Sequence, residues 1–470
     1  MKDELLSILK PVGQEHILRY FDELDDGGRQ KLAAQIKAID WPKVIQWTKE
    51  AGESLSQDAL TTVTPAPYKP EHPEKPDDKV LYDKAIQRGI NLMRNSKVAA
   101  FTVAGGQGTR LGYDGPKGTY PVSQIRHKSL FQIFAEGILR NQRKYGRTIP
   151  WYIMTSVIND TPTRAFFRDN SFFGLDKSQV MFFTQGMLPA FDLATGKALL
   201  EAKDSIALSP NGHGGSFQAL HDSGALKDML GKGITTLSYW QVDNPMIRQF
   251  DPLFLGLHDI SGSEMSSRAL IKRDAKEKLG HFCIDDGKLI IIEYSDMPDS
   301  LLYRTDPDGR LSFRAGSPAI HVLSTSFIKR ITDGTLSLKP HRAEKKVAHL
   351  DENGVLVKPE APNALKLEFF LFDALPLAGN PLILEGDRDE EFAPVKNPDG
   401  QDSPESSRAA MNARAARWIS AAGIPFPRKA DGTPAAVVEL SPAVFGSAED
   451  VKANAKLIPQ INAGDEIYIG

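Results

Sequence analysis

Residues 98–112 read VAAFTVAGGQGTRLG, and this stretch decides the fold. Its first six residues form a short apolar run with no polar face, which is typical of a strand buried on both sides in a parallel sheet. Glycines follow directly and let backbone amides approach a phosphate, because no Cβ stands in the way. The stretch therefore predicts a buried strand that leads into a phosphate-binding loop. The glycines are Gly105, Gly106 and Gly108.

Two positive charges accompany these glycines, on Arg110 and Lys117. A dinucleotide-binding loop would need Gly or Ala where Leu111 stands, with an acidic residue at the end of the second strand, and neither is present. A Walker loop would need Gly-Lys followed by Ser or Thr, whereas Pro116 precedes Lys117 and Gly118 follows it. The loop suits a nucleoside triphosphate. The alternative is a tight strand-to-helix turn with surface charges.

Further short runs of β-branched and aromatic residues follow this loop, separated by helical or loop segments. Ser129, with Gln132 three residues later, has the form of a capping box at the start of a helix. Strands that alternate with helices predict an α/β fold with a mostly parallel sheet covered on both faces. The runs are PWYIMTS (150–156), VMFFTQG (180–186) and TTLSYWQV (235–242).

Three regions are expected along the chain. Residues 1–95 carry apolar positions at helical spacing and then a connector with five prolines between Thr64 and Pro76, which disfavours helix. Residues 96–385 would form the catalytic domain. Residues 386–470 predict a small α+β domain, because a helical segment is followed by the strand-like runs PAAVVELS and DEIYIG.

The composition limits the classes of function. Lys plus Arg total 57 against 60 Asp plus Glu, so no basic field exists to hold a nucleic acid or an acidic membrane. The single cysteine, Cys283, excludes an internal disulfide and a multi-thiolate metal site. The first residues do not resemble a signal peptide, and no run approaches 18 apolar residues. We expect a soluble, cytoplasmic enzyme with neither nucleic-acid nor membrane partners.

The glycine loop, with its PKG segment, resembles the signature of the eukaryotic-type UDP-sugar pyrophosphorylases, the family of the UDP-N-acetylglucosamine and UDP-glucose pyrophosphorylases. Matches in the same order extend over most of the chain, and the N-terminal QEHILRYFDEL is similar to the acetylglucosamine branch. They are FFTQGMLPA (182–190), PNGHGG (210–215), VDN (242–244), LGHFC (279–283), IEYS (292–295), HRAEKK (341–346), KLEFFLFD (366–373) and EFAPVKN (391–397).

The resemblance implies a nucleotide-diphospho-sugar transferase fold with a Rossmann-like sheet, and a reaction between UTP and a sugar 1-phosphate that yields a UDP-sugar and pyrophosphate. Such a transfer needs positioning and charge neutralisation, because both reactants are anions. Arg110 and Lys117 would hold the triphosphate, and Lys396 would reach the sugar phosphate. Asp243 follows a predicted strand, where its carboxylate suits Mg²⁺. A turn-forming Asp-Asn pair and a solvated surface lysine are the alternatives for Asp243 and Lys396.

The family likeness also implies a set of substrate-binding residues. Uracil would be recognised through hydrogen bonds to its imide edge, from the loop backbone and a glutamine amide, although that glutamine could be an ordinary loop residue. A second glycine loop would cover the nucleotide and sugar, and a glutamate after a strand would accept sugar hydroxyls unless it is only a strand-end charge. The residues are Ala104, Gly105, Gly106, Gln185, Gly212, His213, Gly280 and Glu293, with Gly280 open to interpretation as a turn glycine.

The sugar is less defined than the reaction. The acetylglucosamine branch usually carries Asn at the positions of His213 and Ile320, and His at the first position is more typical of the glucose and broad-specificity branches. Lys366, Phe370 and Phe372 are similar to the acetylglucosamine branch, whose aromatic side chains can line a pocket for an acetamido methyl. We expect N-acetylglucosamine 1-phosphate, with glucose 1-phosphate or broad specificity as the alternative. The two phenylalanines, two apart on a predicted strand, could instead be plain core.

Two classes of protein compete with this hypothesis. A nicotinamide dehydrogenase is disfavoured by Leu111 in the loop. A nucleotide-sensing protein without catalysis would bind UTP without turnover, but the presence of all four charged groups argues against it. We expect a monomer or a weak homodimer.

Overall fold

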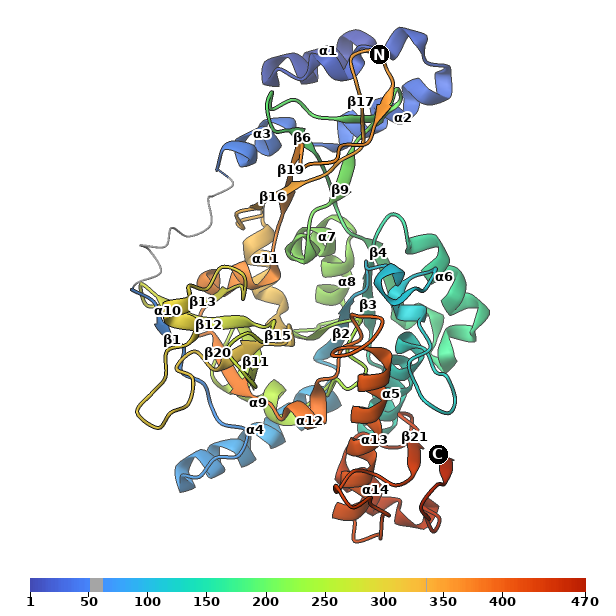
Figure 1. Cartoon of the computed structure of the whole chain (residues 1–470), viewed down its shortest axis with the longest axis vertical. Helices are drawn as coiled ribbons and strands as arrows, with labels where there is room; N and C mark the ends of the chain where they lie inside the picture. Colours follow the sequence, from blue (N-terminus) through green and yellow to red (C-terminus); the bar gives the residue numbers. More distant parts are fainter. Residues whose placement is uncertain (51–61, 335) are drawn as a thin grey trace. The chain divides into compact units, whose positions relative to one another are not determined.

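The computed structural model describes residues 1–50, 62–334 and 336–470, and these divide into two compact units (Figure 1). The smaller unit is built from Met1–Thr62, Gln185–Gln218 and Gly334–Ala374. The larger unit is built from Val63–Thr184, Ala219–Asp333 and Leu375–Gly470. Each unit therefore collects segments that lie far apart in the sequence.

The larger unit is centred on an 11-stranded sheet. Its parallel part consists of β10 (Thr236–Gln241), β2 (Val98–Val103), β3 (Trp151–Thr155) and β4 (Val180–Thr184), hydrogen-bonded in that order. All four strands were predicted from their apolar runs, and Val98 to Thr102 are buried as expected for a strand covered on both faces. The α/β class is thus confirmed.

The sheet continues beyond β10 as a flank of mostly antiparallel pairs, which the alternation of strands and helices did not predict. β15 runs antiparallel to both β10 and β11, whereas β20 runs parallel to β11. The strands of this flank are β1 (Thr64–Pro65), β11 (Met265–Ile271), β12 (Gly280–Asp285), β13 (Lys288–Ile292), β14 (Ala315–Ser317), β15 (His321–Ser324) and β20 (Leu382–Glu385).

Helices cover the sheet and pack closely where glycine allows it. At the crossing of α4 and α9, a Cβ on Gly89 would lie 2.0 Å from the Pro252 carbonyl oxygen, and one on Gly256 would lie 1.7 Å from that of Ala85. Only glycine permits this approach of the two backbones. The helices after residue 62 are α4 (Pro76–Arg94), α5 (Leu130–Tyr145), α6 (Asp160–Asp169), α7 (Ser216–Asp222), α8 (Ala225–Gly231), α9 (Pro252–Ile260), α10 (Asp299–Leu302), α11 (Thr325–Thr332), α12 (Arg388–Glu391), α13 (Pro404–Ala421) and α14 (Ala448–Ala453).

The predicted cap of α5 is present in half of its expected form. The Ser129 hydroxyl accepts a hydrogen bond from the Gln132 backbone N–H at 3.1 Å, which satisfies one of the free amides at the helix start. The Gln132 side chain does not complete the box, because its amide donates to Glu136 one turn further on, at 3.0 Å. The helix is amphipathic and buries Phe131 and Phe134 against the sheet, where Phe134 meets Trp240 edge to face.

The C-terminal segment carries its own small core and the predicted helix and strands. α13 and α14 pack beside the parallel pair β21 (Val437–Leu440) and β22 (Glu466–Ile469). Apolar side chains between them, among them Trp418, Val438 and Phe445, form a separate buried cluster.

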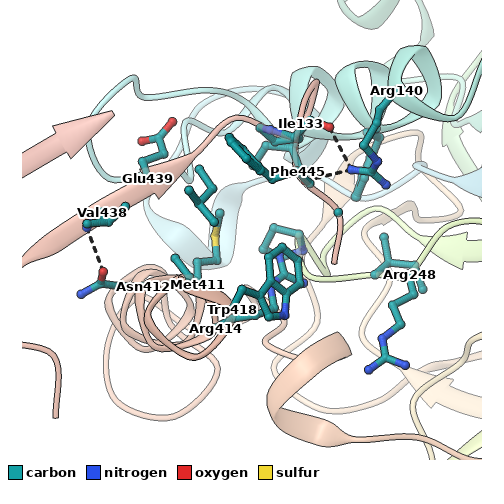
Figure 2. A pocket seen from close by; sticks show the side chains of 18 of the residues that line it. Ile133, Arg140, Arg248, Met411, Asn412, Arg414, Trp418, Val438, Glu439 and Phe445 are labelled. Atoms are coloured by element: carbon teal, nitrogen blue, oxygen red, sulfur yellow. Dashed lines mark hydrogen bonds between the residues drawn. The ribbon is translucent and has the colours of Figure 1, made fainter. Parts of the chain in front are cut away.

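Several hydrogen bonds join this segment to the α5 region. Arg140 donates to the Phe445 carbonyl at 3.0 Å (Figure 2). The Glu439 carboxylate accepts the backbone N–H groups of Ile125 and Arg126 at 2.7 and 3.0 Å. The loop between Lys117 and α5 is therefore held by a residue more than 300 positions later in the chain.

The smaller unit begins with the helices predicted from the N-terminal apolar spacing, α1 (Lys2–Leu9), α2 (Asp26–Ala38) and α3 (Trp41–Glu50). Asp25 caps α2 by accepting the Gly28 N–H at 2.7 Å. The strands are short and antiparallel: β16 (His341–Lys345), β19 (Ala364–Glu368) and β6 (Phe191–Asp192) in one sheet, and the pairs β5 (Met187–Pro189) with β9 (Leu208–Pro210), β7 (Leu200–Ala202) with β8 (Ser205–Ile206), and β17 (His349–Leu350) with β18 (Leu356–Val357).

Within the described ranges, the helices are too short or too polar to cross a lipid bilayer.

Candidate active site

The glycine loop lies at the carboxyl end of β2, in the central parallel part of the sheet, where ligands of open α/β sheets bind. The Ala104 N–H donates to the Met154 carbonyl on β3 at 2.7 Å, which ends the ladder. The loop then folds on itself, because Gly108 donates to the Gly115 carbonyl at 2.9 Å and Lys117 donates to the Gly106 carbonyl at 3.0 Å. The loop and the PKG segment are thus one structure, as the sequence implied.

The glycines of this loop serve two different purposes. A Cβ on Gly108 would lie 2.7 Å from the Tyr113 ring, and one on Gly118 would lie 2.1 Å from the Phe131 ring, so packing within the protein requires both. A Cβ on Gly106 would meet nothing within 4 Å. No protein contact explains a glycine at this position, whereas close approach of a ligand to the loop backbone would.

The four charged residues predicted to act in catalysis gather around this loop. The Lys396 ammonium lies 4.0 Å from the Asp243 carboxylate. Burial lowers the pKa of Lys117. The charge of Asp243 raises this pKa, and the charges of Lys396 and Arg110 lower it further. All three charged side chains are therefore close enough to Lys117 to interact with it electrostatically. Arg110 itself is exposed to solvent. Three cations and one carboxylate at one edge of a sheet suit a ligand with several negative charges.

The alternative for Asp243 is that it forms a turn together with Asn244. In the structure, the side chain of Asn244 makes the turn hydrogen bonds, and that of Asp243 does not take part in them. Asn244 is buried, accepts hydrogen bonds from the N–H groups of Met246 and Ala393, and donates to the Glu391 carbonyl at 2.7 Å. Asp243 contributes its backbone carbonyl, which accepts the Val395 N–H at 2.8 Å. These bonds hold the segment before Lys396 beside β10 and leave the Asp243 carboxylate facing the lysine.

Asn159 is a site residue that the sequence reasoning missed. It lies at the start of α6, is fully buried, and donates from its amide to the carbonyls of Ala104 at 2.9 Å and Gly106 at 3.2 Å. Its own carbonyl accepts the Ser156 N–H at 2.7 Å. An Asn after a predicted strand is ordinary in a turn, so its residue type gave no signal for this role.

Asp243 alone is too small a ligand set for Mg²⁺. The site suits Mg²⁺ only if oxygens of the substrate complete the ligand set. Within the described part of the chain, no group of three or more His, Cys, Asp or Glu side chains is placed to hold a metal ion. Asp243 is a buried residue, with a relative exposure of 9%. One protein carboxylate with phosphate oxygens and water is a usual Mg²⁺ environment, so the donor set fits.

Two further predicted residues, Gly280 and Glu293, lie together on the antiparallel flank. Gly280 begins β12, and a Cβ there would lie 2.6 Å from Ile291 and 3.6 Å from a Glu293 carboxylate oxygen. Gly280 is therefore a strand residue and not a turn glycine. Ile320, the position at which the acetylglucosamine branch has Asn, is buried in the main core, and Ala319 before it has a φ of 58°.

In the smaller unit, Gln185 and Gly212 are brought together. Gln185 directly follows β4, and its amide donates to the Gly212 carbonyl at 2.8 Å, which fixes the orientation of the side chain. The side-chain oxygen of Gln185 thus has a fixed position from which it can accept a hydrogen bond. Gly212 has a φ of 80°, and a Cβ there would lie 2.3 Å from the Phe369 carbonyl oxygen. Close packing against the chain's own backbone explains this glycine without a ligand.

His213, Phe370 and Phe372 form one aromatic cluster, although not as the strand pattern predicted. β19 ends at Glu368, so the prediction that both phenylalanines lie on one strand is wrong; Phe372 lies in a 3-10 helix (Leu371–Leu377). Ring centroids are 5.5 Å apart between His213 and Phe370, and 5.1 Å between Phe370 and Phe372. All three side chains are partly exposed, which argues against plain core.

The protonation state of His213 follows from its contacts. The Leu371 N–H donates to Nδ1 at 3.0 Å, so this nitrogen is an acceptor and the proton is on Nε2. Burial, with a smaller effect from His341, lowers the pKa of His213 to about 4. At neutral pH the ring is uncharged and presents an N–H donor. The His341 ring lies tilted against Phe370 at a centroid distance of 4.4 Å and is hydrogen-bonded to Asp373 at 2.8 Å.

Lys366 lies in the middle of β19, opposite Ala343 of β16. The strand alternates, with Leu365 and Leu367 buried and Lys366 and Glu368 partly exposed. Lys366 therefore lies on the polar face of the small sheet.

A separate cavity of about 80 Å³ lies between α5 and α13 and contains none of the predicted residues (Figure 2). Three of the arginines on its wall are bonded to backbone carbonyls, Arg140 to Pro442 and Phe445, Arg408 to Pro121 and Val122, and Arg414 to Met246 and Glu390. A fourth, Arg248, is bonded to the Glu71 carboxylate at 2.6 Å. These arginines join segments of the protein to one another.

Comparison with known proteins identifies the family. Residues 48–470 match the family model described as UTP–glucose-1-phosphate uridylyltransferase. The human UDP-N-acetylhexosamine pyrophosphorylase-like protein 1 is 35% identical over 94% of this chain and 93% of its own length. The UDP-N-acetylglucosamine pyrophosphorylase of Saccharomyces cerevisiae is 38% identical over 71% of this chain and 72% of its own length.

Among solved structures, the uridine diphosphate N-acetylglucosamine pyrophosphorylase of Trypanosoma brucei aligns with a TM-score of 0.79 at 26% identity, covering 97% of this chain and 95% of that one. A nucleotide-binding α/β transferase is the class that the fold and the loop define. The chain belongs to the UTP–glucose-1-phosphate uridylyltransferase family, the UDP-sugar pyrophosphorylases.

Proposed function

We propose that this uridylyltransferase uses N-acetylglucosamine 1-phosphate as its sugar substrate. A phosphate oxygen of the sugar attacks the α-phosphorus of UTP, the bond from that phosphorus to the β-phosphate oxygen breaks, and pyrophosphate leaves. The observation that carries the reaction is the group formed by Lys117, Asp243 and Lys396 beside the glycine loop. Names of relatives such as the yeast UDP-N-acetylglucosamine pyrophosphorylase support the sugar.

In this scheme the chain positions anions and neutralises charge. Arg110 and Lys117 bind the triphosphate, and Lys396 binds the sugar phosphate. Asp243 would hold Mg²⁺, which would neutralise phosphate charge when bound. Burial lowers the pKa of Lys117 because its ammonium has lost part of its hydration. A phosphate oxygen that takes the place of this water interacts strongly with the ammonium.

Base recognition is assigned to the backbone of Ala104, Gly105 and Gly106 and to Gln185. The Gln185 amide already donates to Gly212, so its carbonyl oxygen remains to accept the imide N–H of uracil. Cytosine has no hydrogen at that ring nitrogen, so it would leave this acceptor unpaired. Gly280 and Glu293 would bind the sugar hydroxyls.

One observation favours glucose 1-phosphate or broad specificity instead. His213 is a fixed N–H donor stacked on Phe370, and Ile320 is buried, so neither supplies the amide expected of the acetylglucosamine branch. Lys366 and the partly exposed Phe370 and Phe372 favour the acetylated sugar. The Rossmann-like description, the cytoplasmic location and a monomeric or weakly dimeric state remain predictions; for the first, α5 and α6 connect successive parallel strands.

The test is pyrophosphate release with UTP and Mg²⁺ against N-acetylglucosamine, N-acetylgalactosamine, glucose and galactose 1-phosphates. Highest kcat/KM with N-acetylglucosamine 1-phosphate would support the proposal. Higher kcat/KM with glucose 1-phosphate would contradict the sugar assignment and leave the reaction intact. UTP binding without turnover on any sugar would contradict the reaction.

A further inference from the structure

We propose that Asn159 is a positioning residue that couples recognition of the uracil base to the placement of Lys117. The inference rests on the proposed function, because it assigns base recognition to the glycine loop and catalysis to Lys117. Asn159 is fully buried, and its role does not require contact with the uracil base or with the Lys117 ammonium. It acts through the loop backbone.

The coupling is visible in the hydrogen bonds of one side chain. The two N–H groups of the Asn159 amide are directed at two carbonyls of the same loop, those of Ala104 at 2.9 Å and Gly106 at 3.2 Å. The Gly106 carbonyl also accepts the backbone N–H of Lys117 at 3.0 Å. A single oxygen atom is thus shared by the buried amide and the catalytic lysine segment.

These bonds determine which way the loop peptides face. In a trans peptide group, the C=O of one residue and the N–H of the next residue point in opposite directions. When Asn159 holds the carbonyl inward, the N–H of the next residue therefore points away from the protein interior. A glycine loop has little intrinsic preference for this conformation, because glycine residues explore most of the backbone space. An external clamp is therefore needed to keep the amides in a ligand-binding arrangement before the ligand arrives.

Asn159 is itself held without freedom to rotate. Its carbonyl oxygen accepts the Ser156 N–H at 2.7 Å, which identifies the other side-chain atom as the nitrogen and sets the direction of both donors. Ser156 directly follows β3, the strand that pairs with β2, so the clamp is built on the rigid sheet rather than on another loop.

The test compares Asn159→Ser, which removes both amide N–H donors and leaves only a shorter hydroxyl, and Asn159→Asp, which keeps the shape but faces two carbonyls with a carboxylate. We expect KM for UTP to rise about tenfold and the preference for UTP over CTP to fall by a similar factor, because each donor contributes roughly that much. KM for the sugar 1-phosphate should change less than about twofold. The UTP dissociation constant, measured by calorimetry without sugar, should rise together with KM.

Asn412 provides the matched control. Its amide also bridges two backbone groups, donating to Ala436 at 3.0 Å and accepting from Val438 at 2.9 Å, but in the C-terminal segment. Asn412→Ser should lower the melting temperature without changing UTP affinity or base preference.

If the Asn159 variants lose stability like Asn412→Ser and keep UTP affinity and base preference, the residue is only structural and the inference is wrong. If Asn159→Asp does not fold, Asn159→Ser decides alone. If the unaltered protein does not bind UTP in calorimetry, the proposed function fails, and that result is distinct from a failure of the clamp.

Discussion

Lys117 is the residue whose surroundings most directly report a function. Its side chain is partly buried, which lowers the pKa of its ammonium; Asp243 opposes this shift, and Lys396 and Arg110 add repulsion. An amine in such a position costs the empty protein free energy, and a bound polyanion recovers it. The Lys117 side chain thus lowers the stability of the empty protein and raises its affinity for a polyanion.

We therefore expect Lys117→Ala to reduce kcat by about a hundredfold or more, as loss of a group that stabilises transition-state charge does. The melting temperature should stay within about 4 °C of the unaltered protein, because the buried charge contributes little to folding. Steady-state kinetics and a thermal melt check both. Lys117→Arg, which retains the charge, should keep more activity than Lys117→Ala, and near-normal turnover in Lys117→Ala would remove the residue from the mechanism.

His213 belongs to the same scale, because its ring fills space beside Phe370 and presents one N–H donor. His213→Asn replaces the ring with a shorter amide and opens the aromatic cluster. We expect the ratio of kcat/KM for N-acetylglucosamine 1-phosphate over glucose 1-phosphate to rise about tenfold, the range that a small change in pocket size produces. An unchanged ratio would show that the cluster does not set sugar preference.

At the scale of elements, the glycine loop separates residues needed for packing from those open to a ligand. Gly118→Ala would place a methyl group 2.1 Å from the Phe131 ring, so we expect a loss of about 1–3 kcal/mol in the free energy of unfolding, typical of overpacking. Gly106→Ala meets nothing within 4 Å, so its stability should be unchanged.

The same Gly106→Ala variant should raise KM for UTP about tenfold or more, because a methyl group in front of the loop displaces the nucleotide. Denaturant unfolding and UTP titration of the two variants give the comparison. Normal UTP affinity in Gly106→Ala would mean that no ligand approaches the loop at this point.

The elements that the sequence predicted well are those whose pattern is enforced by burial on both faces. β2, β3 and β10 were predicted because strands buried on both faces must be apolar throughout, whereas β4 is a partly exposed edge strand that its apolar run alone indicated. Phe370 and Phe372 were assigned to a strand because local spacing does not reveal where β19 ends, and Asn159 was missed because a clamp depends on partners far along the chain. The antiparallel flank was also missed, since its pairing depends on contacts between distant segments.

At the scale of the whole molecule, buried histidines make the stability of the fold depend on pH. His258 donates and accepts hydrogen bonds with Ser266 and Ser324 at 2.9 and 3.0 Å, and burial lowers its pKa from 6.5 to about 4. Burial lowers the pKa of His281 to about 4 as well. Below pH 6.5 the unfolded chain takes up these protons and the folded chain does not, until about pH 4.

We expect the free energy of unfolding to fall as the pH drops from about 6.5 to 4, by about 1.4 kcal/mol per pH unit for each such histidine. His258→Gln should be less stable at pH 7.5 but lose less stability on acidification. Urea unfolding at a series of pH values measures both. An unaltered slope in His258→Gln would contradict the assignment.

The position of Cys283 gives the folded chain an unusual property for solution work. The thiol lies inside the sheet flank on β12, is fully buried, and burial raises its pKa to about 12. We expect thiol reagents to leave the native protein unlabelled and to react fully once it unfolds, so alkylation becomes a direct count of unfolded molecules. Because Cys283 is the chain's single cysteine, a second one introduced at any exposed position could carry a fluorophore or spin label without further engineering.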